Sequence, residues 1–144
     1  MKFKITKAAL LAGLQRVQNI VGMRSTLPIL ANTLLNADEK KLWFTTTDLD
    51  VTIRCSVEAE IQKGGSTTMP VKRLSGIARE LPDKTIEIEI SDKDEATLKC
   101  ESSFFKIIGM KSDEFSCRFF LKLLLNLYPS PGVPATSLIE SLAP

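Results

Sequence analysis

Histidine is absent from this sequence of 144 residues. That absence removes the commonest general base and the commonest side-chain metal ligand, so neither a Ser-His nor a Cys-His catalytic pair can form. The three cysteines, Cys55, Cys100 and Cys117, lie far apart and lack the C-x-x-C spacing of zinc and redox sites. We interpret them as reduced cytosolic thiols packed as small hydrophobic groups, and we expect neither a metal site nor a cofactor.

Long apolar runs are also missing. No segment approaches the roughly 20 apolar residues that a membrane-spanning helix needs, and the first residues show a strand pattern where a secretory signal would stand. The sequence therefore predicts a cytoplasmic protein with no membrane contact. A composition of 44% hydrophobic and 25% charged residues is typical of a globular domain with its own core.

Carboxylates are absent from the first quarter of the chain. Residues 1–37 contain no Asp or Glu but five basic residues, which are Lys2, Lys4, Lys7, Arg16 and Arg24. The net charge of the whole chain is only +2, so the basic excess is concentrated there. Such asymmetry indicates nucleic acid or another anionic surface as a partner, with chance clustering as the alternative.

Hydrophobic periodicity predicts the same order of elements twice. The first copy has a strand at 2–6, a helix at 7–21 and strands at 29–37, 41–46 and 51–62. The second has a strand at 66–69, a helix at 71–81 and strands at 85–90, 96–101 and 104–108. A repeated unit tends to stack its apolar faces. We therefore expect an α+β fold with both helices on one face of an antiparallel sheet and their polar sides toward the same exterior.

Three basic positions are candidate phosphate contacts. Arg24 follows the first helix in a loop bounded by residues 27–29, where a guanidinium can meet a backbone phosphate with two hydrogen bonds; the alternative is an exposed loop arginine. Lys72 and Arg73 begin the second helix and are either phosphate contacts or solvated side chains. No recognition helix or aromatic stacking platform is evident. Any nucleic-acid contact should therefore be independent of base sequence and sensitive to salt.

One pattern suggests an enzyme. Asp48 and Asp50 would lie on one face of a strand and could hold Mg²⁺ beside a phosphate. No third carboxylate and no glycine-rich phosphate loop supports them, and acidic residues are common where a turn enters a strand. A metal-dependent phosphoesterase is thus a weaker alternative than a structural role for this pair.

Several motifs occur in one order along residues 1–115. They are MKFKI at the start, VG at 21–22, RSTLPIL at 24–30, TTTDLD at 45–50, TTMPVKRL at 67–74, RELP at 79–82, FFKII at 104–108 and SDEF at 112–115. Together they resemble the amino-terminal domain of the bacterial sliding clamp, the beta subunit of DNA polymerase III.

The resemblance implies a DNA-clamp fold and a non-catalytic processivity factor. Clamps of this family are head-to-tail dimers with three domains per chain, whose helices line a ring around double-stranded DNA. The ring tethers DNA polymerase and is handled by a clamp loader. Carried over by position, Arg24, Lys72 and Arg79 would contact DNA. The subunit interface would combine an apolar part with a basic part, formed by Phe105 and Ile107 and by Arg73 and Lys99 respectively.

The resemblance ends near Phe115. Residues 116–128 form a Phe/Leu-rich run with neither helical nor strand period, and residues 129–144 are rich in Pro, Ser, Ala and Thr. We expect this tail to be disordered or the product of a shifted reading frame. A chain without the later domains would lack the family's partner-binding pocket and could not close a ring alone. The alternative function is an interaction module whose exposed Phe105 and Ile107 edge docks on a full clamp.

Overall fold

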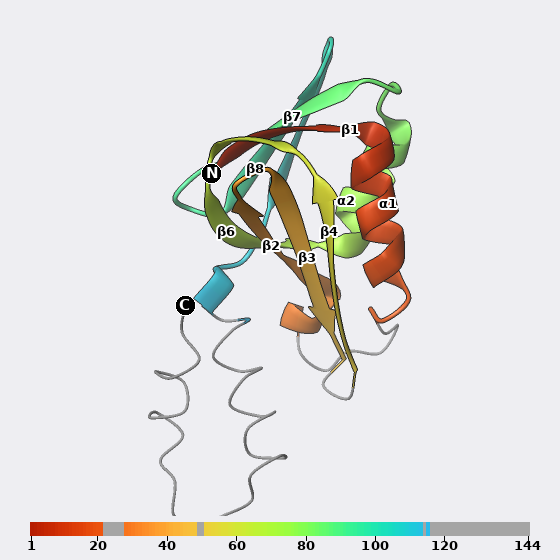
Figure 1. Cartoon of the computed structure of the whole chain (residues 1–144), viewed down its shortest axis with the longest axis vertical. Helices are drawn as coiled ribbons and strands as arrows, with labels where there is room; N and C mark the ends of the chain where they lie inside the picture. Colours follow the sequence, from red (N-terminus) through yellow and green to blue (C-terminus); the bar gives the residue numbers. More distant parts are fainter. Residues whose placement is uncertain (22–27, 49–50, 114, 116–144) are drawn as a thin grey trace, which may run out of the picture.

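The computed structural model describes residues 1–21, 28–48, 51–113 and 115 (Figure 1). The elements of the first copy are β1 (Lys2–Thr6), α1 (Lys7–Gln18), the 3-10 helix η1 (Pro28–Ala31), β2 (Asn32–Asp38), β3 (Lys41–Thr47), β4 (Thr52–Glu58) and β5 (Glu60–Lys63). Those of the second are β6 (Gly65–Pro70), α2 (Val71–Glu80), β7 (Thr85–Ile90), β8 (Glu95–Cys100) and β9 (Ser103–Ile108). No helix in the described ranges is long and apolar enough to cross a membrane.

The strands form two antiparallel sheets, in the orders β5-β1-β7-β8-β9 and β4-β3-β2-β6. Each copy contributes its first strand to the sheet of the other copy. Thus β1 pairs with β7, and β6 pairs with β2. The predicted α+β class and the repeated order of elements are confirmed, and the antiparallel strands are divided between two sheets. The exchange of first strands joins the two copies into one core.

The segment predicted as a single strand at 51–62 is two strands. β4 pairs with β3 in one sheet, and β5 pairs with β1 in the other. The change of sheet occurs at Ala59, whose backbone N–H donates to the carbonyl of Lys40 at 3.0 Å. Alternation of apolar and polar residues continues through this point, so the sequence pattern carries no sign of the change.

The two helices lie side by side against the strands (Figure 1). The hydroxyl of Thr6 accepts a hydrogen bond from the Ala9 N–H at 3.2 Å and caps the start of α1. The Lys7 Nζ donates to the carbonyls of Arg79 and Leu81, at 3.0 and 2.7 Å, and so satisfies free carbonyls at the end of α2. These contacts hold the first residue of α1 against the last turn of α2.

The core lies between the helices and the sheets. Each helix buries one stripe, formed in α1 by Leu10, Leu14 and Val17 and in α2 by Val71, Leu74 and Ala78. The fully buried aromatic rings are Phe3 on β1 and Phe44 on β3. The stripes match the spacing read from the sequence.

After β9 the chain crosses β6, and hydrogen bonds join the two segments at Met110 and Thr68. Met110 and Thr68 exchange two backbone hydrogen bonds of 3.0 Å, and the Thr68 hydroxyl donates to the Met110 carbonyl at 2.8 Å. Asn32 Nδ2 donates to that same hydroxyl at 3.1 Å. Phe115 is 3% exposed. The described residues of the two copies therefore share one buried core.

Candidate nucleic-acid and subunit interfaces

The exposed surface of the paired helices is basic. Its exposed charged side chains are Arg16 on α1 and Lys72, Arg73, Arg79 and Glu80 on α2. Within the described ranges none of the four cations forms an ion pair, because the three ion pairs are Lys2–Glu87, Lys84–Glu101 and Lys106–Glu95. Cations without a carboxylate partner can neutralise phosphates without first breaking an internal contact.

The two helices bring their polar residues together. The Arg79 Nη2 approaches Gln18 Oε1 at 3.5 Å and connects the last turn of α1 with α2. The guanidinium of Arg16 interacts with the thiol of Cys55 on β4, whose Sγ donates to the Gly13 carbonyl at 3.8 Å. Burial raises the pKa of the Cys55 thiol, and the nearby guanidinium of Arg16 opposes that shift. The thiol is therefore neutral at physiological pH and adds no negative charge beneath the helix face.

The structure describes two of the three predicted DNA contacts, Lys72 and Arg79. Lys72 and Arg79 both lie exposed on α2, on the surface shared with α1. Arg24 lies outside the described residues, and its role stays a prediction.

Of the two carboxylates considered as a Mg²⁺ site, Asp48 and Asp50, the structure describes one. Asp50 lies outside the described residues. Asp48 Oδ1 accepts a hydrogen bond from the backbone N–H of Val51 at 2.7 Å, which is the contact of an aspartate in a turn. No group of three His, Cys, Asp or Glu residues in the described part of the chain is placed to hold a metal ion. For Asp48 the structure thus shows the turn role that the sequence favoured.

A groove of about 450 Å³ runs between α2 and β9. Its lining residues are Lys72, Arg73, Gly76, Ile77, Lys106, Ile107 and Ile108. β9 is the last strand of its sheet, so the backbone groups on its outer side have no strand partner in the described structure. The groove therefore combines three cations, of which Lys106 is paired with Glu95, with an apolar wall and an open strand edge.

The expectation that Phe105 and Ile107 form an exposed edge is wrong for the isolated domain. Ile107 is 3% exposed, and Phe105 is half-buried against the core. Their strand partners Leu98 and Ala96 point into the core, so the same face of β9 points inward as well. The exposed apolar side chains on β9 are its alternate residues, Phe104 at 60% and Ile108 at 74%.

The two cations predicted as the basic part of the interface, Arg73 and Lys99, do not line the same groove. Arg73 lines the groove, and Lys99 does not. Lys99 pairs with Phe104 in the β8–β9 register and therefore lies on the outward face. Sequence reasoning missed the apolar residues of that face, Phe104 and Ile108, as well as Gly76 in the groove. The alternation of side chains along residues 104–108 was the sequence signal that could have assigned Phe104 and Ile108 to one face of β9 and Phe105 and Ile107 to the other.

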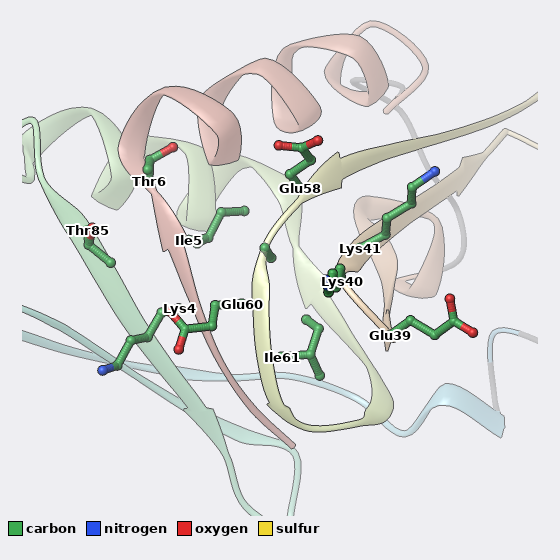
Figure 2. A pocket seen from close by; sticks show the side chains of 11 residues that line it. Lys4, Ile5, Thr6, Glu39, Lys40, Lys41, Glu58, Glu60, Ile61 and Thr85 are labelled. Carbon is green, nitrogen blue, oxygen red and sulfur yellow. The ribbon is translucent and has the colours of Figure 1, made fainter.

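A second cleft, of about 810 Å³, opens beside β1 and β5 (Figure 2). Its lysines are Lys4, Lys40 and Lys41, and its glutamates are Glu39, Glu58 and Glu60. Ile5 and Ile61 lie among them in the close view (Figure 2). Equal numbers of both charges favour neither an anionic nor a cationic ligand, and the lining contains no pairing of a nucleophile with a base.

Comparison with known proteins agrees with this architecture. Residues 1–118 match the family model of the DNA polymerase III beta subunit, N-terminal domain, and the chain belongs to that family. The beta sliding clamp of Chlamydia muridarum is 35% identical over 115 residues, which cover 80% of this chain and 31% of that protein. A Vibrio harveyi beta sliding clamp sequence is 34% identical over 116 residues, which cover 80% of each chain.

Solved structures give the same result for the fold. The crystal structure of the DNA polymerase sliding clamp from Caulobacter crescentus matches with a TM-score of 0.75 and 36% identity, over 79% of this chain and 31% of the clamp chain. The sliding clamp from Bacillus subtilis matches with a TM-score of 0.76 and 28% identity, over 80% of this chain and 32% of that one. The fold is the DNA-clamp fold, and this chain spans less than a third of the Chlamydia and Caulobacter clamps.

Proposed function

We propose that this chain provides the first domain of a DNA sliding clamp, a cytoplasmic processivity factor that surrounds double-stranded DNA and catalyses no reaction. The observation that carries the proposal is the joint surface of α1 and α2. Four exposed cations and one carboxylate share it, and none of the cations is engaged in an ion pair among the described residues. Such a surface attracts the DNA backbone without gripping particular bases.

Phosphate contacts of this kind suit movement along the duplex. The helix surface offers no aromatic side chain for stacking and no recognition helix for the major groove. Each phosphate that a cation neutralises contributes about 0.9 to the slope of log affinity against log salt. We propose Arg24, Lys72 and Arg79 as contacts, and we add Arg16 because it is exposed on the same helix surface as Lys72 and Arg79.

The second part of the proposal is a subunit interface at the groove between α2 and β9. Its partner is an edge strand of another clamp chain that carries apolar and acidic side chains. Arg73 and Ile107 line the groove, Phe105 supports it from the core side, and Lys99 would act from the outward face. A head-to-tail dimer would follow, with DNA polymerase and a clamp loader as the partners of the complete ring.

The experiment needs a complete ring, because residues 1–115 make up only one domain of six in this arrangement. A hybrid clamp is made in which residues 1–115 replace the matched domain of the Caulobacter crescentus clamp. Its retention on nicked circular DNA is then compared before and after the circle is linearised. The proposal predicts retention on the circle and release from the linear form.

The contact residues are tested in the same hybrid. Arg24→Ala, Lys72→Ala and Arg79→Ala should each weaken binding and lower the salt slope by about one. Lys93→Ala is the matched control, because Lys93 is also exposed but lies in the turn between β7 and β8. Equal effects of Lys72→Ala and Lys93→Ala would show that the helix surface is not the DNA-facing side.

The second candidate function is an interaction module that binds a full clamp. Phe104 and Ile108 favour it, because two large apolar side chains stand exposed on one edge strand. Co-elution of the 144-residue chain with the Caulobacter clamp, together with a hybrid that fails to stay on circular DNA, would support this function over the ring. A phosphoesterase would require hydrolysis by the parent chain that disappears when Asp48 and Asp50 are both replaced by Asn.

A further inference from the structure

The first residue of α1 is joined to the end of α2 at three points. The backbone N–H of Lys7 donates to the carbonyl of Lys84 at 3.2 Å. The Lys7 Nζ donates to the carbonyls of Arg79 and Leu81, at 3.0 and 2.7 Å. Leu81 is the C-cap of α2, and Pro82 follows it. Since proline has no N–H and a helix end leaves carbonyls unsatisfied, Lys7 provides donors that α2 itself lacks there.

These bonds decide where the charge of Lys7 lies. Two of the three Nζ protons are directed at carbonyl oxygens, and Lys7 is half-buried. A cation beside the C-terminus of a helix is also favoured by the helix dipole. Lys7 therefore differs from Arg16 and Lys72, which are exposed on the helix surface. Although Lys7 belongs to the basic first quarter of the chain, its ammonium group is engaged within the protein.

The contacts of both ends of α1 converge on Arg79. Its main-chain carbonyl is held by Lys7, the first residue of α1. Its Nη2 lies 3.5 Å from Oε1 of Gln18, the last residue of α1. Arg79 nevertheless stays exposed and has no carboxylate partner among the described residues. Its guanidinium can therefore meet an anion while α1 sets the position of the side chain.

We propose that Lys7 and Gln18 are positioning residues for the DNA contact Arg79, and that Lys7 makes no phosphate contact of its own. This inference rests on the proposed clamp function. Lys7 fixes the last turn of α2 against α1, and Gln18 orients the guanidinium. A side chain whose direction is set before binding loses less conformational freedom when it meets a phosphate, and binding is stronger as a result.

The test uses the hybrid clamp described above, with binding to double-stranded DNA measured at several salt concentrations. Lys7→Met keeps the length of the side chain but removes its charge and its donors. It should weaken binding about three- to tenfold, and Lys7→Arg should restore most of this loss because it keeps both. Lys4→Met is the matched control and should leave binding unchanged. Lys4 is also half-buried and basic, but it lies on β1 and lines the cleft beside β5.

Double variants separate positioning from direct contact. In an Arg79→Ala background neither Lys7→Met nor Gln18→Met should weaken binding further, because both act through the missing guanidinium. The salt slope of the double variant with Lys7→Met should therefore equal that of Arg79→Ala alone. A further loss of about one from that slope would overturn the inference, since it would make Lys7 a phosphate contact.

A stability measurement and the parent hybrid separate the inference from the clamp function. Lys7→Met should lower the Tm of the 144-residue chain by about 3–8 °C, because two hydrogen bonds at the end of α2 are lost. If this variant does not fold, Gln18→Met tests the inference, because it leaves those bonds in place. A retained parent hybrid whose folded variants bind DNA as tightly as the parent would overturn the inference and leave the clamp function standing. A parent hybrid that is not retained on circular DNA would overturn both.

Discussion

Replacing Gly13 by alanine tests how closely α1 packs on the sheet. Gly13 is buried in the middle of α1, and a Cβ there would stand 2.5, 2.9 and 3.0 Å from Cε2, Cδ2 and Cζ of Phe44. Carbon atoms in contact normally lie about 3.5–4.0 Å apart. Phe44 has no exposed surface, so its ring cannot turn toward solvent to make room.

Two opposing terms decide the sign of the effect. Alanine favours a helix interior over glycine by about 1 kcal/mol. Forcing an extra methyl group into a packed core costs about 1–3 kcal/mol, and the overlap with a fixed ring places Gly13→Ala toward the upper end. We therefore expect a net loss of about 1–2 kcal/mol in the free energy of unfolding, which lowers Tm by about 5 °C.

The assay is urea denaturation followed by the fluorescence of Trp43, the one tryptophan of the chain and the sequence neighbour of Phe44. Gly76→Ala is the matched control and should stabilise the protein, because the same substitution there meets no atom. In a Phe44→Leu background the ring is gone, so Gly13→Ala should become neutral or stabilising. A stabilising effect of Gly13→Ala in the parent chain, equal to that of Gly76→Ala, would refute the reasoning.

Three further predictions concern the crossing, the thiol and the open strand edge. Gly109→Ala should cost about 3 kcal/mol or more, because the new Cβ would overlap the Thr68 carbonyl oxygen, and a parent-like melting curve would contradict this. The pKa of Cys55 is raised in the folded state, so the unfolded thiol ionises first as pH rises. The resulting contribution to the free energy of unfolding is complete below pH 9.0 and is lost at higher pH. Urea midpoints should therefore fall at alkaline pH, and Cys55→Ala should weaken this decline. Ile108→Lys should leave the free energy of unfolding within about 0.5 kcal/mol and reduce binding of an apolar dye, since Ile108 is 74% exposed.

Local patterns were enough to predict most of the elements. The buried stripe of α2 and the inward residues of β7 follow directly from periods of 3.6 and two, because side-chain direction in a helix or strand is set by the local backbone. The end of α1 at Gln18 came earlier than predicted. There the Ile20 N–H donates to the Val17 carbonyl and the Val21 N–H to the Gln18 carbonyl, which tightens the chain into turns.

The candidate site could be predicted only in part. The basic, carboxylate-poor character of α1 and the position of Lys72 and Arg73 at the start of α2 were visible as residue types in sequence. The sequence did not show that Lys72 and Arg73 line a groove with Ile107, because these residues are more than 30 positions apart and meet only where α2 packs on β9. The outward exposure of Phe104 and Ile108 likewise depends on which face of the sheet the core covers.

The sequence by itself determined the order of the elements, the apolar stripes of the helices and the excess of positive charge on their polar sides. These properties depend on residues within a few positions of each other. Tertiary structure alone decided that β1 and β6 exchange sheets, that the strand after Val51 divides at Ala59, and that β9 lies at an edge beside α2. Pairing and burial of this kind depend on contacts between segments far apart in the chain, and local periodicity carries no information about them.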